Sequence, residues 1–298
     1  MNTPTIFSNP RLTKALTGLS QTEFDALLPA FTTSWYVAHK SIKGRLRKVG
    51  GGKKGKLPSM ADKLAFILIY LKCYPTYDVM GFLTGRERTR CCRSVQDLLP
   101  ILQSALGKKL VLPVRKITSV EEFFRRFPEA KEVFLDGTER RVEKPKNLKK
   151  RNKLYSGKKK TTTRKTVVMS DRSRRILLLT PTKSGRRHDK RVADKYQVID
   201  HIPQGVTIWT DTGFQGIQKA HPKTVMPMKA TKNKPITFEE KQNNRIISGI
   251  RIVSEHAIGG MKRLKAASDV YRNKLPNLDD TFTLLAAGLW NFHLQQTV

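Results

Sequence analysis

The chain is strongly basic for its 298 residues, because 58 Lys and Arg side chains stand against 24 Asp and Glu, a formal net charge of +34 at pH 7. With 38% hydrophobic residues it has enough apolar material for a packed core, which excludes a disordered chain. So large a charge repels itself unless a polyanion neutralises it. Nucleic acid is therefore the first candidate partner, and an anionic membrane surface is the second.

The composition also limits where the protein is expected to work. The longest apolar run, Leu64–Leu71, is far shorter than the roughly 20 residues that span a bilayer. Residues 1–10 lack the pattern of a signal peptide. The cysteines, Cys73, Cys91 and Cys92, form no C-x-x-C pair and are expected to be reduced. We therefore expect no membrane association and a cytoplasmic protein of the bacterial nucleoid, or a nuclear one in a eukaryote.

The first part of the chain predicts a helix followed by a basic linker. The helix is expected to begin at Ser20, because Ser20 and Glu23 have the spacing of a capping box. Residues 39–58 are rich in Gly and Lys, and residues 50–56 match a phosphate-binding loop in spacing. Leu57 stands where such a loop needs Ser or Thr, so a flexible linker is predicted instead.

Residues 60–106 are predicted to form three helices, with a turn at Gly85 between the second and the third. A short helix, a Gly turn and a longer helix are the layout of a helix-turn-helix, whose second helix enters the major groove of DNA. Four arginines lie around the start of that second helix and are expected to contact DNA: Arg86, Arg88, Arg90 and Arg93. The alternative is an ordinary helical bundle with a solvated basic face.

The second half of the chain alternates strands with helices. Strands are predicted at residues 132–136, 165–171, 174–182 and 206–211, and helices at residues 189–202, 243–266 and 278–294. This order predicts an α/β fold in which helices flank a mixed sheet.

Two of the predicted strands end in an aspartate that a glycine follows closely. Asp136 precedes Gly137, and Asp211 lies two residues before Gly213. Because apolar strands lie centrally in a sheet, the two carboxylates are expected at adjacent strand ends. Two close carboxylates repel each other unless a cation lies between them, and hard divalent cations prefer oxygen ligands. The alternative is that each Asp simply begins a turn.

A third acid lies on the long helix predicted near the end of the chain. On a helical wheel Glu255 falls in a polar stripe with Arg251 and Lys262, opposite the apolar side. Glu255 could therefore add a third metal ligand. Taken by itself, the residue favours a solvated face with ion pairs between successive turns.

Taken in order, these segments resemble the insertion-sequence transposases of the IS5 kind, which have an RNase H-like catalytic domain with a DDE set of acids. The resemblance covers residues 133–265 and, weakly, the helix-turn-helix before them. The Arg-x₃-Glu-x₆-Lys signature of such enzymes appears as Arg251, Glu255 and Lys262. The related pattern also has a Tyr three residues before the Arg, where this chain has Ser248.

The resemblance implies that Asp136, Asp211 and Glu255 are the catalytic acids and hold two Mg²⁺ or Mn²⁺ ions per active site. It implies an enzyme that binds the terminal inverted repeats of its insertion sequence, hydrolyses the phosphodiester and joins the 3′-OH ends to target DNA. Arg251 and Lys262 are then expected to contact the DNA. A homodimer on double-stranded DNA is also expected.

Three further expectations concern the surroundings of these acids. The basic run over residues 140–165 is expected to supply phosphate contacts that do not depend on sequence. His188 has either a structural role or a place behind the metal ligands, facing the site. Asp189 is expected to cap the helix that follows it.

The expected domains are residues 1–58, an N-terminal helix and basic linker; residues 59–125, the helix-turn-helix and a connector; and residues 126–298, the RNase H-like DDE catalytic domain. Three other functions compete with the active transposase. They are a catalytically inactive, transposase-derived DNA-binding protein, a structural RNA-binding protein, and another RNase H-like nuclease. The three acids argue against the first two of these.

Overall fold

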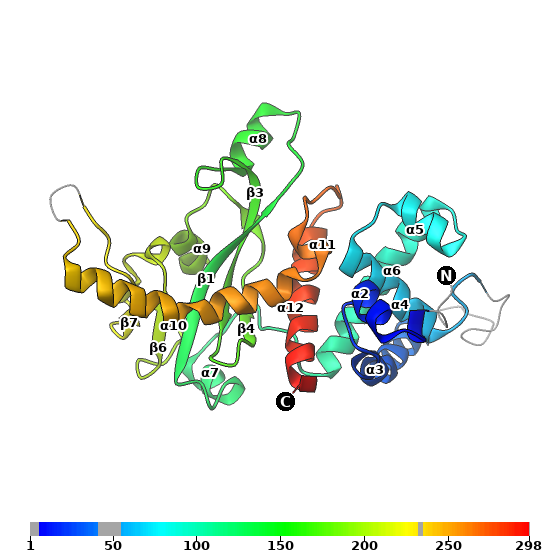
Figure 1. The fold of residues 1–298 in the computed structure, drawn as a ribbon, viewed down its shortest axis with the longest axis horizontal. Helices are drawn as coiled ribbons and strands as arrows, with labels where there is room; N and C mark the ends of the chain where they lie inside the picture. Colours follow the sequence, from blue (N-terminus) through cyan, green and yellow to red (C-terminus); the bar gives the residue numbers. More distant parts are fainter. Residues whose placement is uncertain (1–5, 41–54, 232–234, 298) are drawn as a thin grey trace. The chain divides into compact units, whose positions relative to one another are not determined.

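The computed structural model describes residues 6–40, 55–231 and 235–297 (Figure 1). Residues 41–54, which make up most of the basic linker and most of the loop-like match at residues 50–56, lie outside the described residues. Contacts divide the chain into two compact units. We call Met1–Leu112, Met261–Asp269 and Thr281–Val298 the helical unit, and Pro113–Gly260 with Val270–Asp280 the sheet unit.

The helical unit is built around one helix that is apolar on every side. Every residue of Leu64–Leu71 is buried, so the central helix α4 (Met60–Cys73) shows no amphipathic period. The capping box predicted at Ser20 and Glu23 is confirmed by reciprocal hydrogen bonds between side chains and backbone amides. The unit's other helices are α2 (Pro10–Thr17), α3 (Gln21–Lys40), α5 (Tyr77–Thr84), α6 (Arg88–Lys108), α11 (Lys265–Ser268) and most of α12 (Leu278–Thr297).

The three helices predicted over residues 60–106 are confirmed as α4, α5 and α6. Helix α5 ends at Gly85, which has a left-handed backbone with φ of 60°. A Cβ on Gly81 would lie 2.6 Å from the carbonyl oxygen of Arg86, so only glycine lets the turn pack against α5. The two glycines together fix a tight turn between α5 and α6.

The sheet unit contains a mixed sheet with strand order β2-β3-β1-β6-β7. Strand β1 is antiparallel to β3 and parallel to β6. The strands are β1 (Glu132–Arg141), β2 (Tyr155–Ser156), β3 (Thr161–Ser170), β4 (Ile176–Leu179), β5 (Lys183–Ser184), β6 (Thr207–Thr210) and β7 (Thr224–Val225). The helices are α7 (Val120–Arg126), α8 (Leu148–Leu154), α9 (Asp189–Lys195), the 3₁₀ turns η1 (Thr212–Phe214) and η2 (Ile217–Lys219), and nearly all of α10 (Phe238–Lys262). The expected RNase H-like α/β fold is confirmed.

One face of this sheet packs on a single apolar core. Val133 and Leu135 of β1, Ile208 of β6 and Val192 of α9 are all buried in it. Alternate residues of each strand point to this face, so the flanking positions point away from it. The core therefore fixes which face of the sheet each later residue of β1 and β6 occupies.

Several predicted elements have the wrong bounds, and two of these differences bear on the site. Strand β1 does not end at Asp136 but continues to Arg141, because its basic half stays paired with β3 from Asp136↔Val168 to Arg141↔Thr163. The helix predicted over residues 189–202 ends at Lys195. The later apolar residues, such as Ile199 and Ile202, still enter the core, but from turns. The spacing of these apolar residues matches that of a helix, which is why the sequence predicted a longer one.

Other expectations concern the chain as a whole. The cysteines are free, with Cys91 buried and Cys73 exposed. In the described stretches, no helix combines the length and the apolar character needed to cross a membrane. Residues 281–297, which the expected domain bounds place with the segment from residue 126 onward, belong to the helical unit.

Candidate active site

The pairing of β1 with β6 places two aspartates side by side. The parallel register runs Phe134↔Trp209 and Leu135↔Thr210. Because both strands run in the same direction, Asp136 and Asp211 are the next residue on each chain, at the same level of the sheet. Both side chains are only partly exposed.

Each aspartate is held by a backbone amide that follows it. Asp136 Oδ1 accepts a hydrogen bond of 2.7 Å from Gly137, and Asp211 Oδ1 accepts one of 2.9 Å from Gly213. Asp211 does begin a turn, because it caps the 3₁₀ helix η1. Asp136 lies within a strand, so turn formation does not explain it.

The site is electrostatically strained at Asp136. Burial, followed by the negative charge of Asp211, raises the pKa of Asp136 from 3.8 to about 6. The Gly137 amide and the positive charge of Arg251 act in the opposite direction, and the charge of Asp189 adds to the rise. Asp136, Asp211 and Asp189 thus gather at this end of the sheet, close enough for the charges of the other two to raise the pKa of Asp136.

The helix α10 brings its arginine, but not its glutamate, to this pair. Arg251 is close enough to lower the pKa of Asp136, and its buried Nε has no hydrogen-bond partner among the described residues. Glu255 lies one turn further along the same helix and is exposed. Within residues 6–40, 55–231 and 235–297, no three His, Cys, Asp or Glu side chains gather closely enough to hold one metal ion.

Sequence reasoning missed a buried ionic cluster beside the two aspartates. Lys165 Nζ lies 3.0 Å from Asp189 Oδ1 and 3.2 Å from Glu139 Oε1, and all three side chains are less than 10% exposed. Asp189 was expected to cap α9, but it is the first residue of that helix, and His188 occupies the capping position without a side-chain bond. Glu139 and Lys165 lie in basic segments that read as solvated, so no spacing signal marks them.

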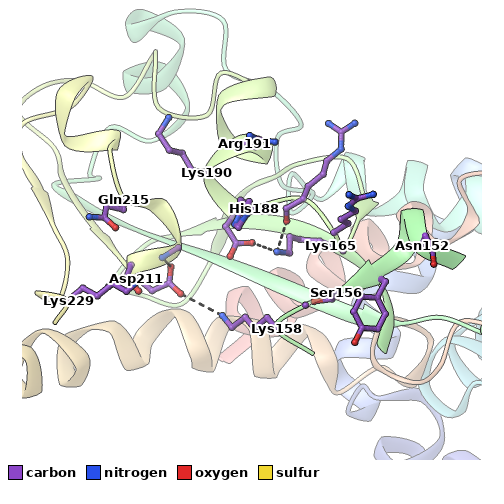
Figure 2. Close-up of a pocket in the computed structure, with 18 residues that line it drawn as sticks. Asn152, Ser156, Lys158, Lys165, His188, Lys190, Arg191, Asp211, Gln215 and Lys229 are labelled. Carbon is purple, nitrogen blue, oxygen red and sulfur yellow. Dashed lines mark hydrogen bonds and ion pairs between the residues drawn. The ribbon is translucent and has the colours of Figure 1, made fainter. Parts of the chain in front are cut away.

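A basic cavity of about 1150 Å³ opens beside Asp211 (Figure 2). Its walls come from the β2–β3 turn, the segment before α9, and η1. Lys158 reaches from the turn to within 4.0 Å of Asp211 Oδ2. The other basic residues that line it are Lys165, Arg186, Arg187, Lys190, Arg191 and Lys229. Cations so outnumber acids there that the cavity suits a polyanionic strand.

Two further residues were predicted to belong to the site, His188 and Lys262. His188 is exposed on the wall of this cavity, so it faces solvent beside Asp189. Lys262 is the last residue of α10 and belongs to the stretch Met261–Asp269 of the helical unit. The structure does not test the role predicted for either residue.

The helix-turn-helix arginines divide into two kinds. Arg88, Arg90 and Arg93 are exposed at the start of α6. Arg86 is partly buried, with its guanidinium 5.7 Å from the centre of the Phe66 ring. This contact gives Arg86 a part in packing the turn against α4.

The acid pair fits a divalent cation on the chemistry of its donors. The oxygens of Asp136 and Asp211 are hard ligands of the kind that Mg²⁺ and Mn²⁺ prefer. The ammonium of Lys158 shows that a cation can approach Asp211 from the cavity. A cation there would also relieve the repulsion that raises the pKa of Asp136.

Comparison with known proteins supports the resemblance to insertion-sequence transposases that the sequence motifs indicate. The family described as DDE superfamily endonuclease matches residues 135–291, beginning one residue before Asp136. A probable transposase for insertion sequence element IS702 from Microchaete diplosiphon is 31% identical over 245 residues, which cover 81% of this chain and 84% of that protein. No solved structure matches the chain. The chain belongs to the DDE superfamily endonucleases and, among them, to the insertion-sequence transposases.

Proposed function

We propose that the protein is an active transposase that cuts DNA at the acid site and joins the freed 3′-OH ends to target DNA. The observation that carries the proposal is the parallel register of β1 and β6, which sets Asp136 beside Asp211. A strand pair built only for stability gains nothing from two repelling carboxylates at one level of the sheet.

Asp136, Asp211 and Glu255 would hold two Mg²⁺ or Mn²⁺ ions. When bound, such ions activate an attacking oxygen and stabilise the leaving one. Glu255 is exposed in this structure, so it would reach the pair from α10, on which Arg251 already faces Asp136. The two residues are one helical turn apart and share a face.

The DNA contacts would come from both units. In the sheet unit, the buried Nε of Arg251 is a donor without a partner among the described residues, and a phosphate oxygen would satisfy it. The basic cavity beside Asp211 would hold the backbone of the strand. In the helical unit, the exposed arginines of α6 would read the element's terminal repeats.

The remaining parts of the proposal follow from the family. Transposition requires two ends to be held together, so we propose a homodimer on double-stranded DNA in the bacterial nucleoid. Lys262 would contact DNA near the cut, as the Arg-x₃-Glu-x₆-Lys spacing suggests.

The test is cleavage of a supercoiled plasmid that carries the gene's own flanking sequences, with Mg²⁺ or Mn²⁺ and with EDTA. Wild type should nick at the flanks in a metal-dependent way. Asp136→Asn should bind DNA but not nick, because the ligand loses its charge and keeps its shape. Asp200→Asn, an exposed change in the same unit, is the matched control and should cut as wild type does.

Failure has a definite meaning. Tight, metal-independent DNA binding without any nicking would show an inactive, transposase-derived DNA-binding protein. Equal nicking by wild type and Asp136→Asn would remove Asp136 from the chemistry.

A further inference from the structure

We propose that Asp189 is a positioning residue of the acid site, held by Lys165 against the two glycines that follow Asp136 and Asp211. This inference rests on the proposed function and deepens it.

Gly137 occupies the interior of a long strand, where glycine weakens a sheet unless another group must come close. That group is Asp189. A Cβ on Gly137 would lie 2.6 Å from Asp189 Cγ, and closer still to its Oδ1. No side chain larger than hydrogen fits at position 137 while Asp189 stays in place.

Gly213, in the 3₁₀ helix η1 that follows β6, meets the same carboxylate. A Cβ on Gly213 would lie 3.0 Å from Asp189 Oδ2 and 2.9 Å from Asp211 Oδ1. Asp189 therefore lies against the residue after Asp136 and against the residue whose amide holds Asp211. One side chain contacts the backbone that positions both acids.

Lys165 fixes Asp189 in this place. Its ammonium has three N–H donors. Three oxygens surround it: Asp189 Oδ1 at 3.0 Å, Glu139 Oε1 at 3.2 Å and the carbonyl of Arg187 at 2.8 Å. The dashed lines of Figure 2 mark the contacts of Lys165 with Asp189 and Arg187. The two ion pairs and the hydrogen bond to the Arg187 carbonyl hold the lysine in place beside Asp189.

The charge balance argues against a role in folding alone. Glu139 by itself would neutralise Lys165, and Thr163 already donates a 2.6 Å hydrogen bond to Glu139. Asp189 adds a second buried negative charge beside the Asp136–Asp211 pair, which raises the pKa of Asp136 further. A buried surplus charge is costly unless something neutralises it. A divalent cation on the neighbouring acids would do so.

The test measures Mn²⁺ binding to the full-length protein without DNA, by titration calorimetry, so that it does not depend on activity. Residues behind metal ligands typically change metal affinity by about 10–100-fold when they are replaced. Asp189→Asn should therefore weaken Mn²⁺ binding by about tenfold or more. Glu139→Gln also removes one negative charge from beside Lys165, but it leaves the contact of Asp189 with the two glycines in place. This variant should therefore weaken Mn²⁺ binding clearly less.

Two results would overturn the inference. One is wild-type Mn²⁺ affinity in Asp189→Asn. The other is an equal loss in Asp189→Asn and Glu139→Gln, which would show a general effect of charge or stability. Asp136→Asn separates this inference from the proposed function. If Asp136→Asn keeps its Mn²⁺ affinity, the metal site itself is wrong. If only Asp189→Asn keeps it, the inference alone fails.

A second pair of variants covers the case in which Asp189→Asn does not fold. Gly137→Ala changes no charge but forces Asp189 away, so it should also weaken Mn²⁺ binding. Gly205→Ala places its Cβ in open space and should bind as wild type does. Wild-type Mn²⁺ affinity in Gly137→Ala would count against the inference.

Discussion

Leu135 on β1 pairs with Thr210 on β6 in a parallel register. This pairing makes Asp136 and Asp211 neighbours, although 74 residues lie between them in the chain. The Thr210 hydroxyl reinforces the register by donating a 3.1 Å hydrogen bond to the Leu135 carbonyl. The site thus places two acids where they repel each other, and several measurable properties depend on that repulsion.

The first prediction concerns stability and pH. Burial and the charge of Asp211 raise the pKa of Asp136 to about 6, so between pH 4 and 6 the folded state binds more protons than the unfolded state. The free energy of unfolding contributed by this group therefore falls as pH rises through that window. Two pKa units correspond to about 3 kcal/mol. Asp136→Asn should consequently raise the melting temperature in EDTA at pH 8, with no gain near pH 4.

Melting curves of wild type, Asp136→Asn and the exposed control Asp200→Asn across this pH range would check it. A gain for Asp136→Asn that is the same at pH 4 and pH 8 would mean that the side chain's ionisation is not its cause. A residue that lowers folding stability but is needed for activity is expected at functional sites.

The second prediction concerns Glu255. Because the side chain is exposed, Glu255→Gln should leave the melting temperature unchanged. Replacing a residue behind the metal ligands costs up to about 100-fold. Because Glu255 is proposed to bind the metal directly, nicking should fall by at least that factor. Glu239→Gln, exposed in the first turn of the same helix, is the control and should nick normally. Normal nicking by Glu255→Gln would show that Glu255 is not the third acid of the site.

The third prediction concerns the start of α6. Arg88 and Arg90 make only long ion pairs of 3.9 Å with exposed acids, and such pairs add little stability. Replacing Arg88, Arg90 and Arg93 by Ala should therefore leave folding intact and remove the preference for the element's ends. Each lost base contact should cost about 1–3 kcal/mol of discrimination.

Competition binding between terminal-repeat DNA and random DNA measures this preference. Lys108→Ala, at the opposite end of α6, serves as the matched control and should keep it. An unchanged preference in the triple variant would assign end recognition to another surface.

Much of this architecture can be read from the sequence, and the exceptions have physical causes. Helices α4 and α5 were predictable because Ser59 and Thr76 cap their starts and Gly85 ends α5. Asp136 and Asp211 stood out because each follows an apolar strand. The length of β1 could not be predicted, because the second half of the strand is polar on both faces. The pairing of that half with β3 depends on residues 20 to 30 positions away. Local pattern does not record such long-range pairing.

Asp189 shows the same limit at the site. An Asp just before a helix reads as a cap, and only the fold reveals that Gly137 and Gly213 leave space for its carboxylate. Lys165 likewise reads as one of many cations in a basic run until β3 carries it into the interior. In this protein the general charge is plain in the sequence, whereas the few charges that are buried are not.

The last prediction concerns the cavity beside Asp211. Lys158 is well exposed and close to Asp211 Oδ2, so it can exchange that carboxylate for a DNA phosphate. Each phosphate contact releases a condensed counterion, which makes the affinity depend on salt. Lys158→Ala should weaken binding to all DNA sequences alike and reduce the slope of log affinity against log salt by about one. Lys195→Ala, exposed at the end of α9 and absent from the cavity wall, should leave both the affinity and the slope unchanged. If the two variants behave alike, the strand does not run through this cavity.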